Sequence, residues 1–253
     1  KPPIGGTLPR KEQRSGTLYL HRPTVEAQRK KVGVVLSGGG AKGVAHIGVL
    51  KVLEKAGIPV DVIVGTSMGS IVGGLYAIGY SADQLDSLVR VQDWMFLLSD
   101  KVNRYDLPFG EKEQDGKYLL SVPFDRGKKR PSGFISGQNV YNLFSDLTIG
   151  YHDSLDFLQL PIPFACVAAD MFHREEIVMK GGNLVQAMRA SMAIPGVFTP
   201  VRTGDRVLVD GGILNNFPTD VARELGAEIV IGVDVQADLM KEDKLESVSG
   251  VIP

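Results

Sequence analysis

The sequence has little of three things: cysteine, net charge and long apolar runs. Cys166 is the only cysteine among 253 residues, so the chain cannot form an internal disulfide. The formal net charge is -1, which excludes a general attraction to nucleic acid or to an anionic membrane. No apolar run reaches the ~18 to 20 residues that a membrane-spanning helix needs. With 43% hydrophobic and 23% charged residues, the composition is that of an ordinary globular protein.

Strand and helix patterns alternate from residue 31 onward. Residues 31–37 and 60–65 are short runs of mostly β-branched apolar side chains, which predict strands. Between them, residues 44–56 place apolar side chains at helical spacing, and residues 70–79 predict a second, very apolar helix. Strand, helix and strand in this order form a βαβ unit, so a parallel sheet is expected. Because both strands are continuously apolar, we expect both of their faces to be covered.

The rest of the chain is less regular in its middle. Residues 100–160 are richer in charge, proline and glycine, which predicts hairpins and short helices over one end of the sheet. The later pattern predicts strands at 163–170, 175–182, 206–212 and 227–235, and the last of these is expected to be buried. It also predicts helices at 183–194, where Pro195 ends the helix, and at 221–226. We therefore expect an N-terminal tail or adapter segment at 1–30, one α/β domain at 31–235, and a C-terminal tail at 236–253 from which a further domain would continue.

A serine between two glycines follows the second predicted strand. Gly65-Thr66-Ser67-Met68-Gly69 fits the pattern G-x-S-x-G. This pattern is typical of a nucleophile on a sharp strand-to-helix turn, because the strained serine backbone leaves room only for small neighbours two positions away. The Ser67 hydroxyl would then lie near a helix N-terminus, whose partial positive charge favours developing negative charge. A purely structural turn explains the same residues, so both interpretations stay open.

A second glycine-rich turn, Gly38-Gly39-Gly40-Ala41-Lys42-Gly43, lies between the first predicted strand and the first helix. Consecutive glycines let a ligand oxygen approach unsatisfied backbone N–H groups. The turn lacks the Walker spacing, because Gly43 follows Lys42 where serine or threonine is needed, and no acidic residue ends the second strand as a dinucleotide site requires. Three interpretations remain: a phosphate cradle, an oxyanion hole to which Lys42 adds positive charge, and a plain tight turn.

An aspartate ends the later apolar run VLVD, and Gly211 and Gly212 follow Asp210. Parallel strands bring their C-terminal ends to one edge of a sheet, where open α/β sheets hold their sites. If this strand is parallel to the first two, Asp210, Ser67 and the glycine-rich turn share that edge. An Asx-type turn is the alternative interpretation of Asp210.

The four histidines match a Ser-His-Asp triad poorly. In α/β-hydrolases the histidine follows the acid along the chain, and no histidine follows Asp210. His21 lies in the N-terminal tail, and His152 and His173 lie in polar, loop-like stretches. His46 is expected to pack within the first helix. A serine–aspartate pair is therefore considered beside the triad.

Four segments resemble the blocks of the patatin-like phospholipases: VVLSGGGAKGVAHIGVL, VGTSMGSIVGGLYA, ASMAIPGVFTPV and VDGGILNNFP. They occur in the family's order across about residues 31–235, which is most of the chain. The sequence most resembles the bacterial branch, in which such domains are often exported and sometimes joined to an outer-membrane barrel. The resemblance implies a three-layer α/β/α fold with a mainly parallel central sheet.

The resemblance also implies roles for the residues of the site. Ser67 would be the nucleophile, and Asp210 would be its base. Gly38, Gly39, Gly40 and Lys42 would form the oxyanion loop, and Gly65, Gly69, Gly211 and Gly212 would support the two motifs. The family usually has arginine at the position of Lys42, and lysine keeps the charge but loses the planar fork of donors. The implied activity is phospholipase A-type hydrolysis of fatty-acyl esters through an acyl-enzyme, without a metal or cofactor.

Two further segments are candidates for lipid contacts. Residues 93–98, DWMFLL, are expected either to line an acyl channel or to pack in the core. A basic cluster would meet anionic headgroups, at roughly 1 kcal/mol per residue near a charged surface, or form a solvated hairpin tip. This cluster consists of Arg126, Lys128, Lys129 and Arg130. Cys166 lies in an apolar strand and is expected to be an inert core thiol.

The expected partners are a phospholipid or other acyl-ester substrate and a membrane surface, with no nucleic acid. The compartment and the oligomeric state are left open. Two alternatives to this hydrolase also remain. A non-catalytic α/β module would bind phosphate or lipid headgroups at the glycine-rich turn without turnover. An α/β-hydrolase with a Ser-His-Asp triad would need one essential histidine and several strands before Ser67, whereas only two good strands precede it.

Overall fold

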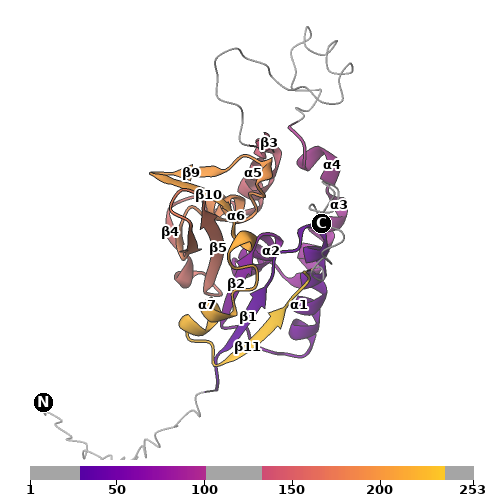
Figure 1. Ribbon diagram of the computed structural model, residues 1–253. Coiled ribbons are helices and arrows are strands. Elements are labelled where there is room, and N and C mark those ends of the chain that lie inside the picture. The colour runs from indigo at the N-terminus through magenta and orange to yellow at the C-terminus, as the bar shows by residue number, and fades with distance from the viewer. Residues whose placement is uncertain (1–28, 101–132, 237–253) are drawn as a thin grey trace, which may run out of the picture.

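The computed structural model describes residues 29–100 and 133–236 (Figure 1). The expected N-terminal tail with His21 and the basic cluster at 126–130 lie outside these residues. Most of the expected C-terminal tail does so too. The division of the chain at residues 30 and 235 therefore stays a prediction.

Four neighbouring strands of the sheet are parallel and lie in the order β11, β1, β2, β5. β1 (Val32–Leu36) and β2 (Val62–Thr66) are joined through α1 (Ala45–Lys55), as the βαβ pattern predicts. Every residue of β1, β2 and β5 (Phe164–Asp170) is buried. The last strand, β11 (Ile229–Val233), was expected to be buried, but it is an edge strand that pairs only with β1 and is half exposed.

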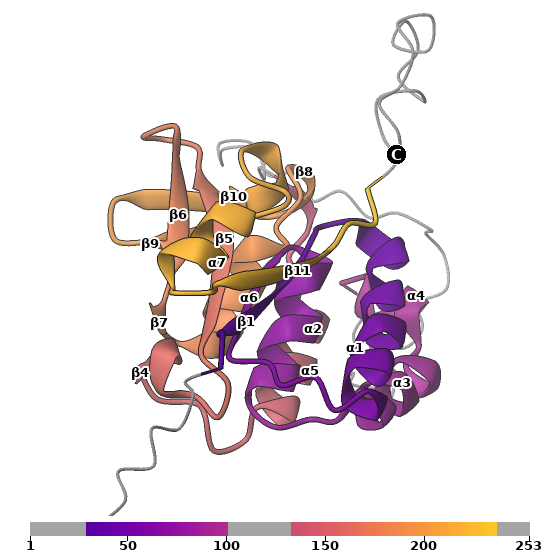
Figure 2. The same cartoon turned by 90° about the horizontal axis from the view of Figure 1, so that it is seen from below.

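The sheet separates two apolar layers (Figures 1 and 2). One face presents Leu36 and Phe164 to a broad layer of helices. The other face presents Val35 and Val167 to α7 (Thr219–Glu224), which forms the third layer in the described part of the chain. The fold is therefore the expected three-layer α/β/α arrangement, with one thin outer layer. The helices of the broad layer are α1, α2 (Met68–Ala77), α3 (Ala82–Val91), α5 (Gln138–Leu147) and α6 (Leu184–Ser191).

Local sequence signals account for several helix ends. Gly57 has a φ of 65°, the left-handed conformation that ends α1. Ser81 and Gln84 form a capping box at the start of α3, which satisfies two backbone N–H groups. α6 ends at Ser191, earlier than the pattern predicts. Cys166 is fully buried, and burial raises the pKa of its thiol, so it is the inert core residue expected from the sequence.

β5 aligns the other strands of the site. Antiparallel β6 (Glu175–Met179) occupies one edge of β5 at residues 166–170. The opposite edge is shared, because residues 164–167 pair with β2 in parallel and residues 168–170 pair with β10 (Arg206–Asp210) in the antiparallel direction. β2 and β10 therefore meet end to end along one edge of β5.

The direction of β10 corrects the expectation that it runs parallel to β1 and β2. β9 (Val201–Thr203) and β10 form a hairpin around Gly204, which has a φ of 59°. β5 extends beyond the end of β2, and β10 fills this free edge from the opposite side. Asp170 fastens the pairing, since its Oδ1 accepts the N–H of Val207 at 3.3 Å.

The hairpins expected in the middle of the chain are absent from residues 133–160. The short strands found there pair with segments that lie later in the sequence. They are β3 (Gly133–Ile135), parallel to β8 (Gly196–Phe198), and β4 (Leu155–Asp156), antiparallel to β7 (Gly181–Gly182). Among the described residues, none of the helices has the length and apolar character needed to cross a bilayer.

Candidate active site

Ser67 forms the sharp turn between β2 and α2. Its φ of 53° and ψ of -123° lie outside the regions that L-residues favour, at a cost of about 1 to 3 kcal/mol. A Cβ on Gly65 would collide with the carbonyl of Gly69, and a Cβ on Gly69 would collide with the carbonyl of Leu36. The chain therefore has the strained strand-to-helix turn that the G-x-S-x-G pattern predicts.

The Ser67 hydroxyl is in direct contact with the Asp210 carboxylate. Ser67 Oγ donates a hydrogen bond to Asp210 Oδ2 at 2.6 Å, and each residue is only 6% exposed. Asp210 Oδ1 accepts the N–H of Gly212 at 2.8 Å, which orients the carboxylate. Gly211 packs against β5 so closely that a Cβ would collide with the carbonyl of Val167. The Asp-Gly-Gly segment thus holds one carboxylate oxygen toward Ser67.

The end-to-end meeting of β2 and β10 produces this contact. Thr66 pairs with Val167, and Asp210 pairs with Ala168, the next residue of β5. Ser67 and Asp210 consequently lie at the same level along β5, although they are 143 positions apart in the sequence. β10 is antiparallel to β5 and not parallel as expected. Asp210 nevertheless lies at the sheet edge that the sequence predicts.

The environment of Asp210 strengthens it as a proton acceptor. Burial raises the pKa of its carboxyl above the ordinary value, and the hydrogen bonds from Ser67 and from the N–H of Gly212 offset this only in part. A carboxylate with a raised pKa is a better general base. The partner of Ser67 is therefore suited to remove its proton.

The glycine-rich turn lies against Ser67 and offers free N–H groups. A Cβ on Gly38 would lie 3.1 Å from the Ser67 Cβ and would collide with Oδ1 of Asn216, so the close approach favours glycine. The N–H of Gly38 donates to the carbonyl of Asn216 at 3.2 Å and is already used. The N–H groups of Gly39 and Gly40 have no acceptor among the residues that the structure describes. Two of the three glycines therefore have N–H groups that no described residue uses.

Lys42 contributes to this turn mainly through its backbone. Its N–H donates to the carbonyl of Gly39 at 3.1 Å and closes the first turn of the 3-10 helix η1 (Gly40–Val44). Its side chain is exposed to solvent. The positive charge of Lys42 is consequently screened by water.

The described histidines are bonded away from the Ser67–Asp210 pair. Nε2 of His46, a fully buried residue of α1, lies 2.8 Å from the carbonyl of Ser37, and burial lowers the pKa of His46. His173 Nδ1 lies 2.6 Å from an oxygen of Asp170. His152 Nε2 lies 2.9 Å from a backbone carbonyl of α5. The serine and the aspartate meet without any of these imidazoles between them.

Ser191, at the end of α6, is a site residue that the sequence reasoning missed. Its Oγ accepts the N–H of Ser67 at 3.0 Å and donates to the carbonyl of Val167 at 2.6 Å. The strained turn is thereby tied to β5. Ser191 belongs to the segment ASMAIPGVFTPV, but neither spacing nor composition indicates which of its side chains faces Ser67.

An apolar cavity of about 80 Å³ begins beside the turn. Met68, the residue after Ser67, lines it together with side chains of α2, α3 and α5. Trp94, Leu97 and Leu98 of the DWMFLL segment form another part of its wall, from α4 (Trp94–Leu97) and the residue after it. The walls of this cavity are apolar, and Ser67 itself is not one of the residues that line it.

One group of side chains in the described residues has metal-ligand character. Ligand atoms of Asp170, His173 and Glu175, at the turn between β5 and β6, lie within 4.8 Å of one another. Burial by itself would raise the pKa of Asp170, but hydrogen bonds from His173 and from the N–H groups of Phe172 and Val207 outweigh it and lower the pKa to about 2. The same contact raises the pKa of His173. These hydrogen bonds stabilise the turn between β5 and β6, which accounts for the clustering of the three side chains.

Replacing Ser191 with alanine should slow the reaction of Ser67 with a fluorophosphonate probe by roughly tenfold. The change leaves the buried N–H of Ser67 without an acceptor, which typically costs about 1 to 3 kcal/mol. The labelling rate and the melting temperature should be measured together.

The matched control is Ser87→Ala, which removes an exposed hydroxyl from α3. It should label at the parent rate. If Ser191→Ala also labels at that rate, Ser191 does not position the turn.

Comparisons with known proteins identify a family for the chain. The family model described as patatin-like phospholipase matches residues 34–223. The chain is 34% identical over 206 residues to patatin-like phospholipase domain-containing protein 6 of Mus musculus, covering 81% of this chain and 13% of that protein. It is 32% identical over 192 residues to an uncharacterized NTE family protein of Mycobacterium tuberculosis, covering 76% of this chain and 28% of that protein.

A solved structure resembles the fold. The crystal structure of VipD from Legionella pneumophila superposes with a TM-score of 0.53 at 17% identity, over 85% of this chain and 52% of that chain. The chain thus spans only a small part of the two curated relatives and about half of the solved structure. The family match covers most of the chain, and we conclude that the chain belongs to the patatin-like phospholipase family.

Proposed function

We propose that this chain is a serine lipid acyl hydrolase that cleaves fatty-acyl esters of phospholipids, with Ser67 as nucleophile and Asp210 as general base. The buried 2.6 Å hydrogen bond between Ser67 Oγ and Asp210 Oδ2 is the observation that supports it most directly. Family membership supports the lipid ester as substrate class. Phospholipase A-type cleavage is the specific form that we propose.

The first step is attack by the Ser67 hydroxyl on the ester carbonyl carbon. Asp210 takes the hydroxyl proton as the new C–O bond forms, and the carbonyl π electrons move onto the oxygen. The raised pKa of Asp210 favours this transfer. Its hydrogen bond to the hydroxyl is already present, so little reorganisation precedes the attack.

The glycine loop would stabilise the oxyanion that results. The N–H groups of Gly39 and Gly40 have no acceptor among the described residues, and Gly38 of the same loop lies against Ser67. A single donor of this kind typically lowers the barrier by about 3 to 4 kcal/mol. The N-terminus of α2, which begins at Met68, adds its partial positive charge.

Collapse of the tetrahedral intermediate releases the alcohol and leaves the acyl-enzyme. Asp210 returns its proton to the departing alkoxide oxygen, and Ser67 keeps the acyl group as an ester. Water then attacks this ester, with Asp210 taking the water proton, and the fatty acid leaves while Ser67 regains its hydrogen. The dyad thus serves both halves of the reaction.

The apolar cavity beside Met68 is the proposed place for the acyl chain. Its walls come from α2, α3, α4 and α5 and are almost wholly apolar. Burial of a methylene group contributes about 0.8 kcal/mol, so a chain seated here would gain affinity with length. The acyl-channel interpretation of the DWMFLL segment fits this place.

A membrane surface is the proposed source of the substrate. Ile213 and Leu214 follow Gly212 directly and are about half exposed. Ile194, also exposed, follows Ala193, whose carbonyl accepts the N–H of Asp210. Apolar side chains around a site mouth would contact lipid while the ester enters.

Ser67→Ala and Asp210→Asn should each lower hydrolysis of p-nitrophenyl acyl esters by roughly a thousandfold or more, because each removes one half of the dyad. Neither change should lower the melting temperature by much, since both replacements are small and Asp210→Asn removes a buried charge.

Fluorophosphonate labelling should occur at Ser67 and be lost in Ser67→Ala. An unlabelled parent protein that still binds lipid headgroups would favour the non-catalytic module. Dependence on His46 in place of Asp210 would disprove the dyad.

The pH profile should report the carboxyl group of Asp210. Asp210 acts as a base only when ionised, so kcat/KM should fall as pH drops through its pKa. Because burial raises this pKa, the acid limb should lie above the ~3.9 of an ordinary aspartate. A limb that follows an imidazole, and that one of the His→Ala variants removes, would contradict the assignment.

Leu88→Trp should shorten the acyl chains that the protein accepts. Leu88 lines the apolar cavity from α3, so a larger side chain there would fill it. We expect kcat/KM for long-chain p-nitrophenyl esters to fall about tenfold or more, with short-chain esters little affected. Val91→Trp on the exposed side of the same helix is the control. Equal losses for short and long chains would exclude this cavity as the acyl site.

A further inference from the structure

Arg189 is a buried cation on the side of α6 opposite to Ser191. The two residues are two positions apart, which is roughly 200° around a helix. Arg189 is only 4% exposed. Ser191 faces the turn at Ser67, so the Arg189 side chain points to a different part of the molecule. The chemistry proposed for the dyad does not use it.

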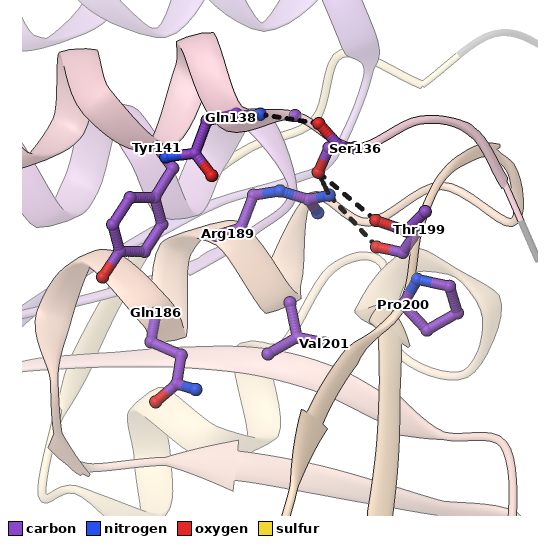
Figure 3. Close-up of a pocket in the computed structure, with 9 residues that line it drawn as sticks. Ser136, Gln138, Tyr141, Gln186, Arg189, Thr199, Pro200 and Val201 are labelled. Atoms are coloured by element: carbon purple, nitrogen blue, oxygen red, sulfur yellow. Dashed lines mark hydrogen bonds between the residues drawn. The ribbon is translucent and has the colours of Figure 1, made fainter. Parts of the chain in front are cut away.

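The guanidinium of Arg189 has only neutral partners. Its Nη2 donates to the carbonyls of Ser136 at 2.8 Å and Thr199 at 3.1 Å (Figure 3). Its Cζ lies 4.9 Å from the ring centroid of Phe198. Its Nη1 is buried and has no acceptor in the part of the chain that the structure describes. Charged side chains are rarely buried without a countercharge, and an unsatisfied buried donor costs about 1 to 3 kcal/mol or more.

The carboxylate of Asp100 does not complete this site. The negative charge of Asp100 favours the charged form of Arg189 without a hydrogen bond between them. The Asp100 oxygens accept hydrogen bonds from the N–H and Oγ of Ser136 at 2.7 to 2.9 Å and from the N–H of Gly137 at 3.3 Å. Within the described part of the chain, Arg189 forms no ion pair. Burial lowers the pKa of its guanidinium, which is the effect of an incompletely compensated charge.

A cavity of about 160 Å³ adjoins Arg189. Gln138 and Tyr141 of α5 and Gln186 of α6 line the same cavity, and Figure 3 shows the guanidinium itself beside Ser136 and Thr199. A water molecule takes about 30 Å³ of liquid volume, so this space is large enough for a tetrahedral oxyanion. Neutral amide and hydroxyl groups can add hydrogen bonds to such a ligand without opposing its charge.

We propose that the Arg189 cavity binds a phosphate-bearing anion, either free or as the headgroup of a lipid other than the one cleaved at Ser67. A guanidinium pairs well with phosphate oxygens, because both charge and planar donor geometry match. Nη1 itself is buried, and a ligand that draws the guanidinium toward the cavity would supply the acceptor that Nη1 lacks within the described residues. Its position on the far side of α6 makes it a second site, separate from the ester-binding site.

The experiment is thermal unfolding of the parent protein in sodium phosphate and in sodium chloride at matched ionic strength. Phosphate should raise the melting temperature above the chloride value, and the shift should grow with concentration as ligand binding requires. No phosphate-specific shift would mean that water fills the cavity, and this would overturn the proposal.

Gln186→Glu provides the sharpest variant. Residues 186 and 189 are neighbours on one face of α6, so the new carboxylate can pair with Arg189 in place of the ligand. This variant should melt higher than the parent in chloride and lose the phosphate-specific shift. Gln159→Glu makes the same charge change at an exposed position outside the cavity and should keep the shift. A shift that survives Gln186→Glu would place the phosphate elsewhere, for example at the glycine loop, and would overturn the proposal.

Sedimentation with vesicles separates the two sources of the anion. Vesicles of phosphatidylcholine with phosphatidic acid are compared with vesicles of phosphatidylcholine alone. A preference for phosphatidic acid that Gln186→Glu loses identifies a lipid headgroup, whereas a phosphate shift without this preference identifies a free anion. Hydrolysis of a soluble p-nitrophenyl ester should be unchanged in Gln186→Glu, so failure of the anion site and failure of the proposed hydrolase are distinguishable.

Discussion

The contact between Ser67 and Asp210 depends on how β5 shares one of its edges. β6 occupies the opposite edge, so β2 and β10 must lie in line along the remaining one. One strand ends at Thr66 and the other ends at Asp210, one residue further along β5. The 2.6 Å hydrogen bond is a consequence of this register. A slip of β10 by one residue would turn Asp210 to the other face of the sheet.

α6 and the turn after it connect both members of this pair. Ser191 accepts the N–H of Ser67, and the carbonyl of Ala193 accepts the N–H of Asp210. The same short segment therefore stabilises a strained serine backbone and sets the end of β10. Arg189, on the far side of α6, bonds the carbonyls of Ser136 and Thr199, so a ligand at that cavity would contact the helix that supports the dyad.

Burial affects the charged groups of Asp210 and Arg189 in opposite ways. At Asp210, partial removal from water raises the proton affinity that a base needs, and the folded state accepts a less stable carboxylate in return. At Arg189, burial leaves a cation whose Nη1 has no acceptor among the described residues. At Arg189 the charge also lies beside a cavity, which is the arrangement expected of functional sites and unusual for a core.

The sequence by itself determined much of the local structure and indicated the two residues for which we propose a catalytic role. Apolar periodicity was enough for β1, α1, β2 and α2, glycine and capping signals were enough for several helix ends, and the motifs indicated Ser67 and Asp210. Only the tertiary structure decided that β10 runs antiparallel, that β11 lies at an exposed edge, and that Ser191 and Arg189 flank the two sites. The physical reason is that periodicity reports which face of an element is buried, whereas strand direction and side-chain partners are set by pairings between segments far apart in the chain.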